Sequence, residues 1–136
     1  KVAAMQRLVD KGLASGLGDR SAAALYDEAK RGLKAGALIV GFRLSLEAEE
    51  DIIGIAEHGI LAFGEAQAER YHQELFTLIA LIADHPRMAR ERREIVPPVR
   101  IQPFKAHLVV YLIEDDGEVL VLRVRHAHEN WESEEK

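Results

Sequence analysis

Hydrophobic positions recur at helical spacing near the start of the chain. Between residues 2 and 13 they fall three or four positions apart, which predicts an amphipathic helix. Gly12 and Gly16 end this pattern, and the small residues 15–18 predict a flexible joint. Ser21 then predicts the N-cap of a second short helix, because its hydroxyl can accept a hydrogen bond from a free backbone N–H. The apolar stripe of that helix consists of Leu25, Tyr26, Ala29 and Leu33.

The next patterns predict a strand followed by a helical hairpin. Residues 39–44 form a short, β-rich apolar run, and Ser45 directly after it can cap a helix. Apolar residues then repeat at helical spacing over 48–60 and again over 68–82. We expect the turn between the two helices in the stretch bounded by Gly59 and Gly64.

Three further strands are predicted over 99–104, 107–113 and 119–125. The middle run is apolar at nearly every position and is therefore expected at the centre of a sheet. An Asp-Gly pair at residue 117 indicates a tight turn before the last strand. Together these elements predict an α+β fold, with a helical hairpin packed on an antiparallel β-sheet. Along the last strand, alternation places Leu120, Leu122 and Val124 on one face and Arg123 and Arg125 on the other.

Composition limits the class of protein. The 136 residues suffice for one compact domain, and a hydrophobic content of 48% can form a core. The longest apolar runs are too short to span a membrane. The absence of cysteine excludes disulfides and thiolate metal sites and fits a reducing cytoplasm. We expect a cytoplasmic protein without metal or cofactor; the first residue, Lys1, indicates a piece of a longer protein.

Charge divides the chain into two parts. Residues 1–35, here called the arm, carry seven basic and four acidic side chains, a net charge of +3. Residues 36–136, the body, carry eleven and nineteen, a net charge of −8. A body of this charge repels nucleic acid on average, and opposite net charges favour binding of the arm to the body. Two alternatives stay open: both charges lie on ordinary solvated faces, or the arm is a helical hairpin integral to the core.

The apolar stripes of the arm predict that it docks on another surface. A segment of this length cannot bury two stripes within itself, so we expect them to be buried against the body. Because the join near Ala35 is short, the arm can also dock on a second copy of the chain. Such an exchange of arms would produce a dimer or a higher oligomer. The expected contacts are Leu8, Val9, Leu13, Leu25, Tyr26, Ala29 and Leu33.

Several stretches of the body follow one another in the order seen in a known family. They are Phe42-Arg43-Leu44-Ser45 leading into residues 47–51, residues 63–71, His85-Pro86-Arg87 with residues 90–93, Arg100, residues 107–111, and residues 123–126 ending near Trp131. This ordered set resembles the ParE toxin branch of the RelE/ParE superfamily. The resemblance implies a helical hairpin on a sheet, and a growth inhibitor of a type II toxin–antitoxin system that acts on DNA gyrase without being an enzyme.

The arm has a resemblance of its own. Residues 8–16 and the run Asp19-Arg20-Ser21 are similar to the C-terminal tail of a ParD antitoxin. The resemblance implies that a ParD-like antitoxin is the partner, and that an antitoxin tail here precedes its toxin, joined around residues 35–38. A natural fusion, an engineered fusion and two polypeptides joined end to end would all give this order.

Two groups of residues are candidates for target binding. In the ParE family, residues at the C-terminal end are implicated in toxicity, and alternation leaves Arg123 and Arg125 free to meet a partner. A basic loop over 87–93 is either a binding patch or a solvated loop, because Glu91 and Glu94 lie within or beside it. The toxicity candidates are Arg123, Arg125, His126 and Trp131, and the basic loop contains Arg87, Arg90, Arg92 and Arg93.

The alternative function is that of a RelE-like, ribosome-dependent mRNA endoribonuclease. Such a reaction needs an acid, a base and cations, for which the candidates are Arg100, His107 and His126, with Arg123 beside them. Arg123 and His126 alternate to opposite faces of a regular strand, and the net charge of the body opposes docking on RNA. We therefore predict that the body is not an enzyme. A structural module without a target is the third interpretation.

Overall fold

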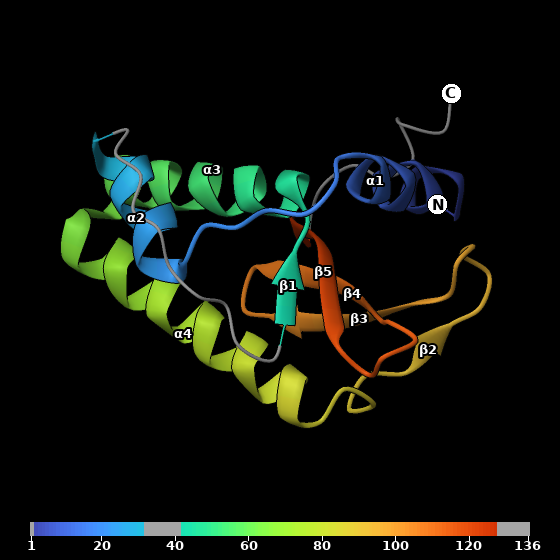
Figure 1. The fold of residues 1–136 in the computed structure, drawn as a ribbon. Coiled ribbons are helices and arrows are strands. Elements are labelled where there is room, and N and C mark those ends of the chain that lie inside the picture. Colours follow the sequence, from blue (N-terminus) through green and yellow to red (C-terminus); the bar gives the residue numbers. More distant parts are fainter. Residues whose placement is uncertain (1, 32–41, 128–136) are drawn as a thin grey trace.

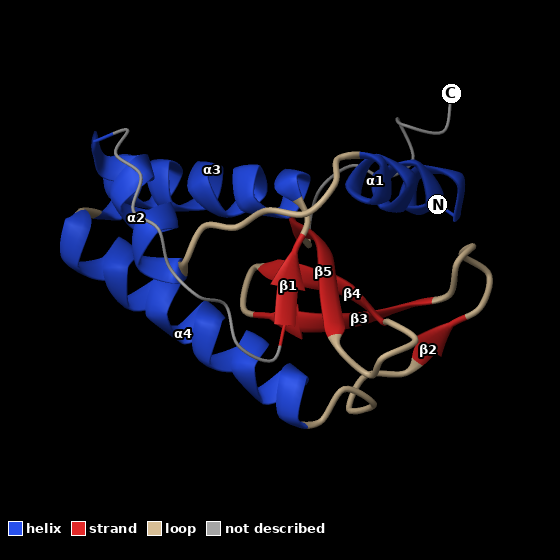
Figure 2. Cartoon of the chain, viewed as in Figure 1, coloured by secondary structure: helices blue, strands red, loops and turns tan. Residues whose placement is uncertain are grey.

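Helices and strands are distributed along the chain as Figure 2 shows. The structure, a computed structural model, describes residues 2–31 and 42–127, and leaves the side chains of 27–31 undescribed. The elements in chain order are α1 (Val2–Ala14), α2 (Ala22–Arg31), β1 (Phe42–Leu44), α3 (Leu46–Phe63), α4 (Glu65–Asp84), β2 (Glu91–Arg92), β3 (Val99–Phe104), β4 (His107–Ile113) and β5 (Val119–His126).

The sheet has the strand order β1-β5-β4-β3-β2, which confirms the α+β class and the central place of β4. Neighbouring strands from β2 to β5 are antiparallel, as expected. β1 differs, because it pairs in parallel with β5, with Leu44 opposite Val121. The predicted sheet is therefore corrected to a mixed one. β2 is a second correction, since this short strand lies in the segment expected to be a loop.

The helical hairpin begins and turns at residues with identifiable roles. Ser45 caps α3 as predicted, with its Oγ accepting a hydrogen bond from the Ala48 backbone N–H at 3.0 Å. Gly64, with a φ of 92°, makes the turn into α4. The expectation that Gly59 also bounds the turn is wrong, because α3 continues through it. A Cβ at Gly59 would lie 3.3 Å from the Ala68 Cβ, so this glycine lets the two helices approach closely.

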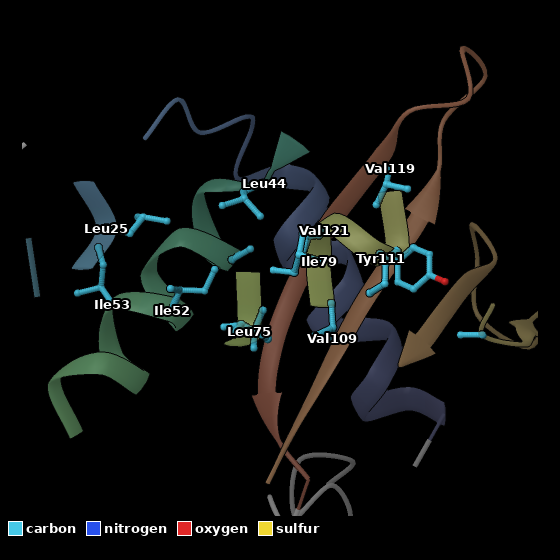
Figure 3. Close-up of a cluster of buried hydrophobic side chains, with 14 residues drawn as sticks. Leu25, Leu44, Ile52, Ile53, Leu75, Ile79, Val109, Tyr111, Val119 and Val121 are labelled. Atoms are coloured by element: carbon cyan, nitrogen blue, oxygen red, sulfur yellow. The ribbon is translucent and has the colours of Figure 1, made fainter. Parts of the chain in front are cut away.

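The main core lies between the hairpin and one face of the sheet (Figure 3). Tyr111 is fully buried there, and its hydroxyl donates to the Pro86 carbonyl at 2.7 Å, which satisfies the one polar group of its ring. Leu25 of α2 also belongs to this core and is fully buried. The other large members include Leu44, Ile52, Leu75, Ile79, Val109, Val119 and Val121.

The opposite face of the sheet is covered by α1. Val9 is fully buried against a second apolar cluster, and Met5 packs at its margin. In Figure 1, α1 lies beside the start of α3, whereas α2 lies across the hairpin. Arm helices thus contact the sheet and the hairpin from two sides. The sheet residues of the second cluster are Val99, Val110, Leu120 and Leu122, joined by Ile95 from the preceding loop.

A β-bulge interrupts the alternation of β5. Val110 pairs with Arg123 whereas Tyr111 pairs with Val121, so Leu122 is an extra residue without an opposite partner. As a result Leu122 packs in the cluster beneath α1, and Val124 packs in the main core on the other face. The prediction that these two side chains share a face is therefore wrong.

Candidate functional site

The segment between the two arm helices, residues 15–20, is here called the joint. It lies beside the end of the edge strand β1. The Gly18 N–H donates to the Leu44 carbonyl of β1 at 2.8 Å. Leu17 forms an isolated antiparallel bridge with Ser45, at the point where β1 leads into α3. Main-chain pairing of this kind fixes the path of the joint along the body.

The same joint completes the N-terminal turn of α3. Backbone N–H groups at the start of a helix have no partner within the helix. Here the Leu46 N–H donates to the Gly16 carbonyl at 3.0 Å, and the Glu47 N–H donates to the Ser15 Oγ at 3.2 Å. Two of the first N–H groups of α3 are therefore bound by the arm.

A buried ion pair lies next to this contact. Glu49 on α3 is fully buried, and Arg20 of the arm is 8% exposed. The Arg20 Nε donates to Glu49 Oε1 at 2.8 Å, and the Arg20 backbone N–H donates to Oε2 at 3.0 Å. The guanidinium also reaches Glu50, with Nη2 donating to Oε2 at 3.2 Å. Both oxygens of the buried carboxylate are thus bound by one residue of the arm.

The contacts of helix α2 with the hairpin include one apolar side chain and two hydrogen bonds. Leu25 is inserted into the main core, and Tyr26 donates from its hydroxyl to the Glu65 carbonyl at 3.1 Å. His72 of α4 lies with its Nε2 2.7 Å from the Ala22 carbonyl. Burial lowers the pKa of His72, so the ring is neutral and its Nε2–H donates to this carbonyl.

The helix α1 contacts the sheet along a line of small and apolar residues. Ala4, Leu8 and Gly12 are buried at intervals of four. At Gly12 a Cβ would lie only 2.7 Å from the Leu122 carbonyl oxygen, so the backbone of α1 runs very close to β5. The expected burial of Leu13 is wrong: it is 38% exposed. It follows Gly12 by about 100° around the helix and falls at the margin of the contact.

Two other expected arm contacts cannot be placed. The side chain of Ala29 and the whole of Leu33 lie outside the described residues. The same holds for Trp131 among the toxicity candidates.

Arg123 of β5 is held by an acidic residue of α3. It is 2% exposed, and its Nε and Nη2 donate to Asp51 Oδ2 and Oδ1 at 2.7 and 2.9 Å. Arg125 donates from Nη1 to Oδ1 at 3.3 Å, and the Val124 N–H donates to Oδ2 at 3.1 Å. The prediction that Arg123 is free to meet a partner is therefore wrong. Arg125 remains partly exposed, and His126 is exposed.

A cleft of about 810 Å³ opens between the hairpin and the adjoining ends of β4 and β5. His107 and His126 face each other in its wall, with their ring centroids 5.2 Å apart. The Tyr71 hydroxyl lies 2.6 Å from His107 Nδ1. Burial, and to a smaller extent the nearby rings of His126 and His58, together lower the pKa of His107 to about 4. Within the described residues, three or more ligating side chains nowhere gather into a metal site.

The residues proposed for the nuclease alternative do not converge. Arg100 on β3 lies opposite Tyr111, whereas His107 lies four positions away along β4. At about 3.3 Å per residue this places the two backbones roughly 13 Å apart along the strand. The Arg100 guanidinium instead donates to the Ala89 carbonyl. His107 and His126 are brought together, but without Arg100.

The basic loop is partly neutralised by its own acidic residues. Arg92 donates from Nε to Glu94 Oε2 at 2.7 Å, and Arg93 donates from Nε to Glu91 Oε1 at 2.9 Å. Arg87 and Arg90 are exposed on the same segment. These contacts weaken the loop as an anion-binding patch.

Sequence reasoning missed the pairing of the most buried charges. Glu49 and Asp51 fit the acidic residues that are favoured near a helix N-terminus, and Arg20 was named only within the antitoxin-like run Asp19-Arg20-Ser21, without a partner. Their partners lie 29 and 72 residues away in the chain, at Arg20 and Arg123. No spacing pattern marks contacts between such distant positions.

The chain is similar to known proteins in sequence and in fold. A family model described as "ParE toxin of type II toxin-antitoxin system, parDE" matches residues 42–131. No curated protein matches the chain significantly. A solved structure titled "Chromosomal ParDE TA system from P. aeruginosa" is similar with a TM-score of 0.54 at 18% identity, covering 61% of this chain and 90% of that chain. This similarity concerns the fold. Among the described helices, none is both long and apolar enough to cross a bilayer.

Proposed function

Because the chain belongs to the ParE toxin family of type II toxin–antitoxin systems, we propose that its body inhibits bacterial growth and that the arm, acting as a ParD-like antitoxin segment, holds it inactive. The observation that carries this proposal is the coverage of the body by the arm. α1 lies on one face of the sheet, the joint completes the start of α3, and α2 inserts Leu25 into the main core.

DNA gyrase in the cytoplasm is the proposed target. The family resemblance supports it, and the net charge of −8 on the body favours a protein target over direct binding to nucleic acid. We assign the contact to the exposed end of β5, at Arg125 and His126, together with Trp131. Arg123 is left out of this set because Asp51 engages it inside the protein.

Releasing the arm in the full chain tests the proposal. Val9→Asp and Tyr26→Asp together place unpaired carboxylates in two buried arm contacts outside the main core. We expect induction of this variant to stop growth of a bacterial host, and the purified protein to inhibit supercoiling by gyrase. The matched control is Leu17→Asp, at an arm leucine that is 53% exposed, and it should grow like the parent chain.

The same experiment separates the alternatives. Growth arrest with intact supercoiling, but with cleavage of mRNA on programmed ribosomes, would favour the endoribonuclease. Normal growth of the Val9→Asp, Tyr26→Asp variant, with its circular dichroism spectrum retained, would contradict the proposal.

A further inference from the structure

We propose that Glu49 and the start of α3 form a binding site for a peptide with glycine two residues before arginine, so that the body selects its antitoxin segment through Gly18 and Arg20. The inference rests on the proposed function in one respect, since it takes the arm to be an antitoxin segment. Such a site would also accept a separate polypeptide carrying the same pattern.

One carboxylate contacts both the main chain and the side chain of residue 20. Glu49 Oε2 accepts the Arg20 backbone N–H, and Oε1 accepts its Nε–H. The same guanidinium extends to Glu50 through Nη2. A lysine would present one compact ammonium in place of this planar fork, so it would not match the separate positions from which Nε bonds Glu49 and Nη2 bonds Glu50.

The site also excludes a side chain at residue 18. A Cβ at Gly18 would lie 2.0 Å from Glu49 Oε2 and 2.1 Å from its Cδ. The carboxylate cannot move aside without losing its bonds to Arg20. Gly16 differs in kind, because its φ is +83° while no atom lies within 4 Å of a Cβ built there. Gly18 is therefore required for space, and Gly16 for its backbone conformation.

The burial of Glu49 makes its pairing with a cation selective. Its side chain is fully buried, and a buried carboxylate without a cation is strongly disfavoured. A segment with a neutral residue at position 20 would leave that charge unpaired as it docked. The site therefore favours the correct segment and also penalises incorrect ones, which is how charged groups give specificity.

Amide hydrogen exchange on the full chain tests the coupling between the two residues. We expect Arg20→Met and Gly18→Ala each to speed exchange of the Leu46 amide, which bonds to Gly16, by tenfold or more. The double variant should exchange no faster than the faster single variant, because both changes break the same contact. The β4 amides of Val109 and Tyr111 report global unfolding, and their exchange should speed up by a smaller factor than that of Leu46, because the lost contact lies at the start of α3. If Arg20→Met does not fold, Arg20→Lys should show a smaller effect of the same kind.

The matched control is Lys11→Met, which removes an exposed arm cation 4.0 Å from Glu47 and should leave Leu46 exchange within twofold. Exchange rates unchanged by Arg20→Met, or effects that multiply in the double variant, would overturn the inference. These exchange rates do not depend on toxicity. If the released body failed to inhibit growth, the proposed function would be contradicted and the exchange result would still stand.

Selection is tested with synthetic peptides of residues 1–31 titrated into the full chain carrying Gly18→Ala, whose own arm is loosened. The parent peptide should bind at least tenfold more tightly than peptides with Gly18→Ala or Arg20→Met. Equal affinities for the three peptides would contradict selection at this site.

Discussion

His107 illustrates how burial fixes the charge of a single residue. Its folded-state pKa is lowered from 6.5 to about 4, by burial first and then by His126 and His58. Between those values the unfolded chain binds a proton at residue 107 that the folded chain does not bind. The free energy of unfolding should therefore fall as the pH drops from about 6.5 to about 4. Because His107 is only half-buried, we expect a loss on the order of 1–2 kcal/mol.

Urea unfolding at pH 7 and pH 4.5 measures this change. His107→Gln should reduce the difference between the two pH values, whereas the exposed His85→Gln should keep it. His72, whose pKa burial also lowers, contributes a dependence of the same sign in every variant. An unaltered pH dependence in His107→Gln would contradict the assignment.

Residues with local roles were predictable, and those with distant partners were not. Ser45 caps α3 by bonding the third residue after it, so both members of the contact lie within one short sequence motif. Arg20 and Glu49, by contrast, meet only once the chain has folded. The same distance hid the pairing of Arg123 with Asp51, and made an exposed side chain the natural expectation.

At the scale of elements, periodicity predicted the type of each main helix and strand because it records which side chains face an apolar surface. It does not record direction, so the parallel pairing of β1 with β5 was missed. Nor does it detect the extra residue in β5, which changes the face of every later side chain on that strand. Both errors concern pairing between strands and leave the elements themselves unchanged.

The close contact between α1 and β5 leads to a prediction at this scale. A methyl group at Gly12 would meet the Leu122 carbonyl oxygen, which is part of the sheet backbone and cannot swing aside. Gly12→Ala should therefore lift α1 and lower the free energy of unfolding by about 1–3 kcal/mol, although alanine favours helix. Gly54→Ala in α3 is the matched control, because no atom lies within 4 Å of its added Cβ. It should raise stability by about 0.5–1 kcal/mol.

Urea unfolding followed by circular dichroism gives both values. A stabilised Gly12→Ala variant would show that α1 does not rest on β5 as closely as described.

At the scale of the whole molecule, the arm and the body share one core. Leu25 comes from the arm, yet it is fully buried in the cluster that contains Ile79, Val109 and Tyr111 (Figure 3). Opposite net charges of +3 and −8 orient the two parts, but exposed charges contribute less to stability than buried apolar area does. The arm should therefore unfold together with the body in one cooperative transition.

Leu25→Ala measures that coupling. Removing a fully buried leucine side chain should lower the free energy of global unfolding by about 2–5 kcal/mol. Leu17→Ala, at an exposed arm leucine, should change it by less than about 0.5 kcal/mol. In a urea titration, the unfolding midpoint from far-UV circular dichroism should equal the midpoint from protection of the β4 amides, since both follow one transition. If the arm were only a loosely tethered ligand, Leu25→Ala would release α2 early and leave the β4 midpoint unchanged, and arm and body would then be separate folding units.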